Sequence, residues 1–390
     1  MSPTYLDNSA TTRVDPRVRE AMDRYHDESY GNAGSMHWMG IQAGRALDEA
    51  RESIARSIGA SSREIVFTSG GTESDNLALQ GYAFANRNKG DHIITTAIEH
   101  HAILNTCEFL ESQGFKVTYL PVDKDGMVSV DDVKNAMTDK TILVSVMAAN
   151  NEVGTVQDIR EIGGVVRDKK VAFHTDAVQS LCKMPIDVVK DNVDMMSISG
   201  HKFHGPKGVG ALFVRKGITL RPMFYGGGHE RGMRSSTENV PGIIGMARAL
   251  EIGIAEMPES VPCMTSIRDR IIDGVLSSVE GCWLNGHRTA RLCNNANFCF
   301  ERVEGQALVL VLSSEGFMTS TGSACSSKSL EPSHVLRALG LANRHARGSL
   351  RISLSRFNTM DEAKAFLDIV PEAVGKVRLF SAQTPSGSRS

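Results

Sequence analysis

The segment SISGHKFHGPKGVG, residues 197–210, places Lys202 between two histidines and among several glycines. A lone lysine is usually a solvated surface charge, and this residue alone gives no reason to prefer another interpretation. However, Lys202 directly follows a strand that we expect to be buried. An amine that is partly desolvated there has a lowered pKa and can form a Schiff base with a carbonyl group. The neighbouring motifs therefore have to decide between a surface charge and a covalent role.

Short apolar runs rich in β-branched residues alternate with helical patterns between residues 64 and 199. This alternation predicts a mostly parallel sheet covered by helices on both faces, with residues 210–215 as an added edge strand. In open sheets of this kind, ligands bind beyond the carboxyl ends of the strands. Five of the predicted strands are followed there by polar segments, which are TSGGTESDN, IEHHA, ANNEVGT, HTDAVQS and SGHKFHGPKG. We expect these segments to form one rim for one ligand.

Gly70, Gly71 and Thr72 lie at a predicted turn from a strand into a helix. The exposed N–H groups and the positive end of a helix make such a turn a cradle for an anion, most often phosphate. A plain Ser/Thr helix cap explains the same residues equally well. The pattern is neither a P-loop nor a G-x-G-x-x-G motif.

Asp176, followed three residues later by Gln179, stands at a predicted strand end. A carboxylate there can hold a protonated ring nitrogen, although a helix cap is the better explanation of Asp176 taken alone. His100 and His101 can stack on a planar ring and move protons near neutral pH, or simply bond to the backbone. A Schiff-base lysine, a carboxylate for a pyridine nitrogen and a phosphate cradle together are what pyridoxal phosphate (PLP) requires.

Two further residues stand apart from the sheet motifs. Cys325 lies in the Ser/Gly-rich segment TSTGSACSSKSL, whereas buried structural cysteines usually have apolar neighbours, so we expect an exposed thiol. Arg351 lies on a predicted strand of the C-terminal part, and its planar guanidinium suits a substrate carboxylate. A surface ion pair is the alternative for Arg351.

The composition is that of a globular protein. The 390 residues are 41% hydrophobic and 23% charged, and the net charge of −2 gives no sign of a nucleic-acid partner. The N-terminal residues have no signal-peptide pattern, and the longest strongly apolar run, ALVLVL, is too short to span a bilayer. The seven scattered cysteines predict reduced thiols in a cytoplasmic protein, and no metal site is expected.

In combination, these motifs resemble the NifS/IscS group of cysteine desulfurases, which are fold-type I PLP enzymes of the class-V aminotransferase family. The resemblance extends from Tyr5 to Thr359 and also includes NNEVGT, GGGHERGMRSSTEN, TGSACSS, EPSHVLRALGL and LRISLSRFNT. It implies an α/β fold in which a large domain has a mostly parallel seven-stranded sheet and a smaller domain is α+β. We predict a large PLP-binding domain at 15–258, a small domain at 1–14 and 259–380 that carries the cysteine segment, and a disordered tail at 381–390.

The resemblance also implies the cofactor contacts. PLP is carried on Lys202, Asp176 pairs with its ring nitrogen, Gln179 bonds its ring hydroxyl, and His100 stacks on the ring. The complete set implied to bind the cofactor is Gly71, Thr72, His100, Asn151, Asp176, Gln179, Ser199, His201, Lys202 and Thr237. Thr237 is expected to reach the phosphate from a second subunit, because the family is dimeric.

The substrate residues follow from the same resemblance. Asn32, Asn151 and Arg351 are implied to bind the substrate, and Cys325 is implied to be the persulfide nucleophile beside the catalytic residues Lys202 and His100. Two segments depart from the family pattern. GNAGSMH around Asn32 lacks the usual proline and serine, and RSST has a serine where a glycine is usual before the threonine.

The implied activity is conversion of L-cysteine to L-alanine, with the sulfur carried on Cys325 to an iron–sulfur scaffold protein or another sulfur acceptor, for iron–sulfur clusters, other thio-cofactors or thiolated tRNA. The alternatives are a selenocysteine lyase, which uses the same chemistry, and a PLP aminotransferase or decarboxylase, which has no use for the TGSACSS segment. A non-catalytic sulfur-relay protein on the same fold would be expected to have lost the lysine, aspartate and cysteine, and all three are present. We expect a homodimer without direct nucleic-acid or membrane partners.

Overall fold

The computed structural model describes residues 3–322 and 332–383, and Cys325 therefore lies outside the described residues. Its larger sheet has seven strands in the order β2 (Ile65–Thr68), β8 (Gly210–Val214), β7 (Met195–Ser199), β6 (Ala172–Asp176), β5 (Thr141–Ser145), β3 (His92–Thr96) and β4 (Lys116–Leu120). The strands from β7 to β4 are parallel, whereas β8 is antiparallel to both of its neighbours. The predicted mostly parallel seven-stranded sheet is confirmed.

The prediction of an edge strand at residues 210–215 was wrong. β8 lies inside the sheet and pairs with β2 on one side and β7 on the other, and all five of its residues are buried. The edge on this side is β2. An apolar run identifies a buried strand, but its neighbours depend on contacts between distant segments, which the run itself does not contain.

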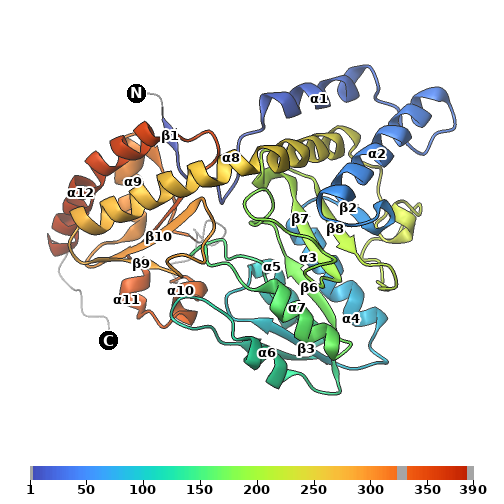
Figure 1. Cartoon of the computed structure of the whole chain (residues 1–390), viewed down its shortest axis with the longest axis horizontal. Helices are drawn as coiled ribbons and strands as arrows, with labels where there is room; N and C mark the ends of the chain where they lie inside the picture. The colour runs from blue at the N-terminus through green and yellow to red at the C-terminus, as the bar shows by residue number, and fades with distance from the viewer. Residues whose placement is uncertain (1–2, 323–331, 384–390) are drawn as a thin grey trace.

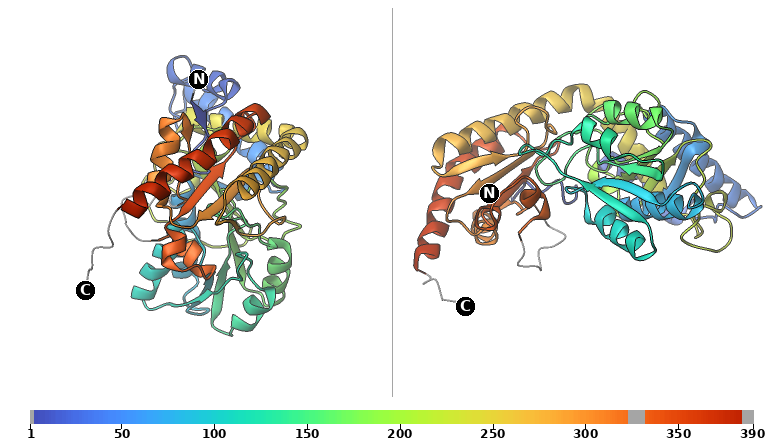
Figure 2. Two further views of the ribbon diagram at one scale, coloured as in Figure 1. Left: turned by 90° about the vertical axis from the view of Figure 1, so that its left-hand side faces the viewer. Right: turned by 90° about the horizontal axis from the view of Figure 1, so that it is seen from below.

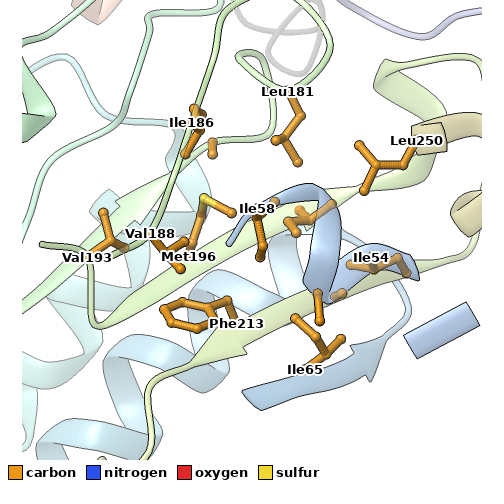
Figure 3. Packing of buried hydrophobic residues seen from close by; sticks show 14 of the residues in the cluster. Ile54, Ile58, Ile65, Leu181, Ile186, Val188, Val193, Met196, Phe213 and Leu250 are labelled. Atoms are coloured by element: carbon orange, nitrogen blue, oxygen red, sulfur yellow. The ribbon is translucent and has the colours of Figure 1, made fainter. Parts of the chain in front are cut away.

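The two faces of the sheet are covered by different helices (Figure 1). Ile65 and Phe67 of β2 pack in the apolar cluster on one face with residues of α1 (Pro16–Asp27), α2 (Trp38–Ser57), α7 (Ile159–Asp168) and the first half of α8 (Val240–Ser278). Figure 3 shows Phe213 of β8 in the same cluster with Ile54, Ile58 and Leu250. Val66, whose side chain points to the other face, packs with residues of Leu77–Gly81, α4 (Tyr82–Ala85) and α5 (His101–Ser112), which follow the short helix α3 (Gly71–Asn76) along the chain. Successive side chains of β2 point to opposite faces of the sheet and therefore pack against the helices on both sides.

A second, smaller layer lies at the other end of the molecule. Its antiparallel sheet has the order β12 (Ser349–Ser353), β10 (Asn295–Phe300) and β9 (Cys282–Asn285), and it packs with α9 (Gly305–Ser314), α12 (Met360–Gln383) and the second half of α8. The N-terminal strand β1 (Thr4–Tyr5) pairs with β11 (Phe317–Met318) in this part. The remaining helices of the described chain are α6 (Val130–Ala136), α10 (His334–Ala338) and α11 (Asn343–Ala346).

α8 is one helix of 39 residues that joins the two parts, as Figures 1 and 2 show. The predicted boundary between residues 258 and 259 falls inside it. Pro258 and Pro262 are both exposed, on the stretch between the two apolar clusters, where a missing backbone N–H costs least. In the described part of the chain, no helix is long and apolar enough to cross a bilayer.

Candidate active site

A cavity of about 290 Å³ lies at the carboxyl ends of the parallel strands, where the larger sheet meets the N-terminal segment and the smaller part. Each of the five predicted rim segments contributes to its wall, so the expectation of one shared rim is confirmed. The lining residues that sequence analysis singled out are Gly71, Thr72, His100, His101, Asn151, Asp176, Gln179, Ser199, His201, Lys202 and Arg351.

Lys202 lies in this wall and is not a solvated surface lysine. It ends the single 3₁₀ turn Gly200–Lys202 that follows β7, and its Nζ donates to the carbonyl oxygens of Ser9 at 2.7 Å and Ala10 at 2.8 Å. The glycines of the motif allow the turn to close, because a Cβ at Gly205 would lie only 2.8 Å from the Gly200 oxygen. The N-terminal segment and the turn after β7 therefore both position the Lys202 amine at the cavity.

Asp176 and Gln179 form the wall at the end of β6. The Asp176 carboxylate accepts from the Val178 N–H at 2.9 Å, and burial raises the pKa of Asp176 to about 6, against the opposing effects of that bond and of the Lys202 charge. Gln179 donates from Nε2 to the Ser9 oxygen at 2.9 Å. Its other amide atom, Oε1, is buried and has no hydrogen-bond partner among the described residues. This part of the wall therefore offers a charged acceptor and an uncharged one.

His100 caps the N-terminus of α5. Its Nδ1 accepts from the Ala102 N–H at 3.1 Å, and because a backbone N–H can only donate, the neutral ring carries its proton on Nε2. Burial, assisted by the charge of Lys202, lowers the pKa of His100 to about 4. The proposed proton role rested on an unshifted pKa near neutrality. In this environment the ring is neutral at pH 7, and Nε2–H is its one available donor.

The expected anion cradle lies where Gly71 begins α3. A Cβ at Gly71 would lie 2.8 Å from Val178 Cγ2, so a larger residue at this position requires the Val178 side chain or the turn itself to shift. Buried Ser199 and half-buried His201 line the same cavity, and His201 Nδ1 lies 3.1 Å from the Thr11 hydroxyl. Burial lowers the pKa of His201 to about 4, so this ring contributes a hydrogen-bonding group and not a fixed charge.

Arg351 is 2% exposed, which excludes the surface ion pair considered above. From β12, its Nη1 donates to the carbonyl oxygens of Asn151 and Gly322, both at 2.9 Å, and its Nη2 lies 2.7 Å from Asp7 Oδ1. Its Nε is buried and has no hydrogen-bond partner among the described residues. The guanidinium is therefore fixed in orientation, and its Nε–H is left for a further acceptor.

The other predicted site residues are not brought together within the described part of this chain. Asn32 and Thr237 are exposed and do not line the cavity, and Asn32 Oδ1 accepts from the Gly34 N–H at 2.9 Å. Cys325 lies outside the described residues. No group of three His, Cys, Asp or Glu side chains in the described ranges is arranged to hold a metal ion.

Several lining residues were not predicted: Ser9, Ala10, Asp75, Met147, Glu152, Val178, Gly322 and His334. Most of them lie inside motifs that the sequence analysis quoted, such as the buried Glu152 of NNEVGT, whose Oε2 accepts from the Ser333 hydroxyl at 2.6 Å. For Glu152, a charged residue beside Asn151 in a motif that follows a buried strand is the signal that could have found it. His204 does not line this cavity. Its Nδ1 contacts the Arg13 oxygen at 3.0 Å and its ring meets Phe357 edge-on, so it packs the N-terminal segment against the C-terminal part.

Comparisons with known proteins agree with this geometry. The family described as aminotransferase class-V matches residues 4–366. The chain belongs to the aminotransferase class-V family. A curated member, cysteine desulfurase IscS of Methanosarcina thermophila, is 53% identical over 99% of this chain and 95% of its own.

Solved structures extend the likeness of this class-V chain to three dimensions. A NifS-like protein aligns with a TM-score of 0.91 and 42% identity over 96% of this chain and all of its own. SspA, solved in complex with cysteine, aligns with a TM-score of 0.81 and 39% identity over 91% of this chain and 99% of its own. The predicted resemblance to the NifS/IscS group of cysteine desulfurases and the fold that it implies are both confirmed.

Proposed function

We propose that this cysteine desulfurase uses PLP to convert L-cysteine to L-alanine and carries the released sulfur as a persulfide on Cys325 to an acceptor protein, such as an iron–sulfur scaffold. The observation that carries this proposal is the meeting of Lys202, Asp176 and His100 in one cavity with Arg351. The relative solved with cysteine supports this substrate. The high identity to an IscS-type desulfurase supports sulfur transfer to an acceptor.

The residues present fit PLP. Buried Asp176 offers a carboxylate to a protonated ring nitrogen, and the unpartnered Gln179 Oε1 needs a donor, which the ring hydroxyl would provide. Gly71, at a helix N-terminus, suits a phosphate group, as expected for Thr72, Ser199 and His201 beside it. Bound PLP supplies an electron sink that stabilises negative charge on the substrate Cα.

The side chains of this chain do the rest of the chemistry. Lys202 Nζ would hold the cofactor covalently, and as a free amine it would move the proton at the substrate Cα. Arg351 Nε and Asn151 bind the substrate carboxylate, which fixes the Cα in reach of Lys202. His100 donates from Nε2 toward the substrate sulfur or the departing carbon fragment.

Cys325 completes the reaction as a thiolate. Its Sγ attacks the substrate sulfur, so that an S–S bond forms while the substrate Cβ–S bond breaks. The electron pair of the broken bond stays with the three-carbon fragment, which takes up a proton and leaves as alanine. No external oxidant or reductant is required, because the sulfur atom is passed on at the oxidation level of a persulfide.

We also propose that the enzyme is a cytoplasmic homodimer in which Asn32 and Thr237 complete the site of the other subunit. In support, the segments near both residues expose large apolar side chains, namely Tyr30, Met36, Trp38, Phe224 and Tyr225. The two segments lie at the end of the molecule away from α12 (Figure 1). The six cysteines among the described residues are all free thiols, which supports a reducing compartment.

Alanine and sulfide release from L-cysteine with a reductant tests the activity. Lys202→Ala is expected to lose covalently bound PLP, and Cys325→Ala to keep PLP but release no sulfide. Mixing Lys202→Ala with Thr237→Ala protomers tests the shared site, because a mixed dimer regains one complete site. Sulfide release by Cys325→Ala at the wild-type rate would contradict the nucleophile, and failure of the mixture to exceed either variant would contradict the shared site.

A further inference from the structure

Three carboxyl groups border the candidate cofactor cavity, those of Asp75, Glu152 and Asp176, although the proposed function uses only Asp176. Asp75 from α3 is 1% exposed and lines the cavity together with Asp176, which is 6% exposed. Among the described residues, no lysine or arginine forms an ion pair with Asp75. Its Oδ1 is buried and has no hydrogen-bond partner in this part of the chain. A charged carboxylate without such partners is costly to bury, so its protonation state needs an explanation.

The groups that face Asp75 do not supply a positive charge. His174 on β6 has its Nε2 3.8 Å from Asp75 Oδ1, but its ring is held between the hydroxyls of Ser145 at 2.9 Å and Ser197 at 3.1 Å. Burial lowers the pKa of His174 to about 3, so the ring is neutral. Glu99, also fully buried, adds a further carboxyl group near Asp75 and no cation.

The carboxyls of Asp75 and Asp176 are not equivalent, because the Lys202 amine favours ionisation of only one of them. Its charge lowers the pKa of Asp176 against the effect of burial. Burial and the negative charge of Asp176 raise the pKa of Asp75 well above its usual range, and the Ser197 hydroxyl opposes this only in part. Two neighbouring acids that share a site do not both ionise, and their environments decide which one keeps the proton.

We propose that Asp75 is a positioning residue that holds a proton in the working enzyme, so that Asp176 is the single negative charge facing the ring nitrogen of the cofactor. This rests on the proposed use of PLP. The neutral Asp75 side chain packs in the cavity wall beside His174 and Ser197. Of the two aspartates, Asp176 alone is then ionised. One negative charge then matches one protonated nitrogen, and no second buried charge has to be compensated.

Infrared difference spectroscopy of the holoenzyme at pH 7.5 reads this proton directly. Wild type minus Asp75→Asn is expected to contain the C=O stretch of a protonated carboxyl group and no ionised carboxylate bands. Glu99→Gln serves as the matched control, because its difference spectrum identifies the separate band of the other buried acid. Ionised carboxylate bands in the Asp75→Asn difference spectrum would overturn the proposal.

Cofactor binding supplies the second measurement. Asp75→Asn, which resembles the neutral acid in shape and charge, is expected to keep the PLP dissociation constant within about threefold and the neutral-pH absorbance spectrum of bound PLP. Asp75→Ala and Asp176→Asn are expected to weaken PLP by tenfold or more. A spectrum of Asp75→Asn that differs from wild type at pH 7.5, or a dissociation constant that Asp75→Ala leaves unchanged, would reject the role. If wild type binds no PLP, the proposed function fails, whereas infrared spectra of the cofactor-free chain still report the protonation of Asp75.

Discussion

Arg351 Nη2 and Asp7 Oδ1, 2.7 Å apart, join the C-terminal strand β12 to the segment that follows the N-terminal strand β1. The same guanidinium donates to the carbonyl oxygen of Gly322, the last described residue before Cys325. One buried cation thus connects three segments that are far apart in the sequence. The orientation of the proposed carboxylate-binding group depends on all of them.

Asp7→Asn is expected to lower stability by about 1–3 kcal/mol, because the buried guanidinium loses the charge that compensates it. The KM for cysteine should rise several-fold with a smaller change in kcat, since the guanidinium is less well oriented. Urea unfolding and steady-state kinetics measure the two effects. Asp361→Asn is the matched control, because its ion pair with Lys364 is exposed and should contribute little. Equal effects of the two substitutions would contradict the prediction.

Gly71→Ala is expected to weaken PLP binding by at least tenfold. The added Cβ would lie 2.8 Å from Val178 Cγ2, so the Val178 side chain or the first turn of α3 must shift, and both line the proposed cofactor cavity. Gly164→Ala on α7 is the control, because no atom lies within 4 Å of the added Cβ and alanine favours a helix. Titration of the cofactor-free enzyme with PLP tests both. An unchanged affinity in Gly71→Ala would remove this turn from the phosphate site.

Glu99→Gln is expected to change the pH dependence of stability. Burial raises the pKa of Glu99 to about 8, so between about pH 4.5 and 8 the folded state binds a proton that the unfolded state has released. Wild type therefore loses stability as the pH rises through this window. The variant lacks this contribution and should unfold with a smaller loss between pH 5 and pH 8 in urea titrations. Parallel curves for both proteins would show that Glu99 is ionised when folded.

His100→Asn tests the helix-capping role of residue 100 separately from the proposed proton-donor role of the imidazole ring. Asparagine can also accept the Ala102 N–H at the start of α5, so stability at pH 7 should change by less than about 1 kcal/mol. Burial lowers the pKa of His100 to about 4, and wild type therefore loses stability as the pH falls from about 6.5 to 4, because the unfolded chain binds the proton first. The variant should lose less in this acid window while its kcat falls strongly. A preserved kcat would argue against His100 as a proton donor.

Much of this arrangement could be predicted from local sequence. β-branched runs gave the strands, and the polar segments that follow them gave most of the cavity wall, because parallel strands bring their carboxyl ends to one edge. Lys202, Asp176 and Arg351 were all found in this way or through the motifs that resemble the family. The roles assigned to these residues, and the position of Cys325, stay predictions.

The properties that could not be predicted depend on distant contacts. The place of β8 inside the sheet depends on β2 and β7, and the continuation of α8 past Pro258 depends on its passage between two packed clusters. The low pKa of His100 arises from burial of its side chain, which a local residue pattern does not predict. Asp75 was missed for the same reason, because an aspartate in a helical segment looks like a solvated charge until its surroundings are known.

The residues that form the wall of the cavity are synthesised at different times. Ser9 and Ala10, whose carbonyl oxygens hold Lys202, are synthesised long before Arg351. A nascent chain on the ribosome therefore lacks one side of the pocket until Arg351 has been added. A translation product that stops before Arg351 presents the amine of Lys202 in an incomplete enclosure.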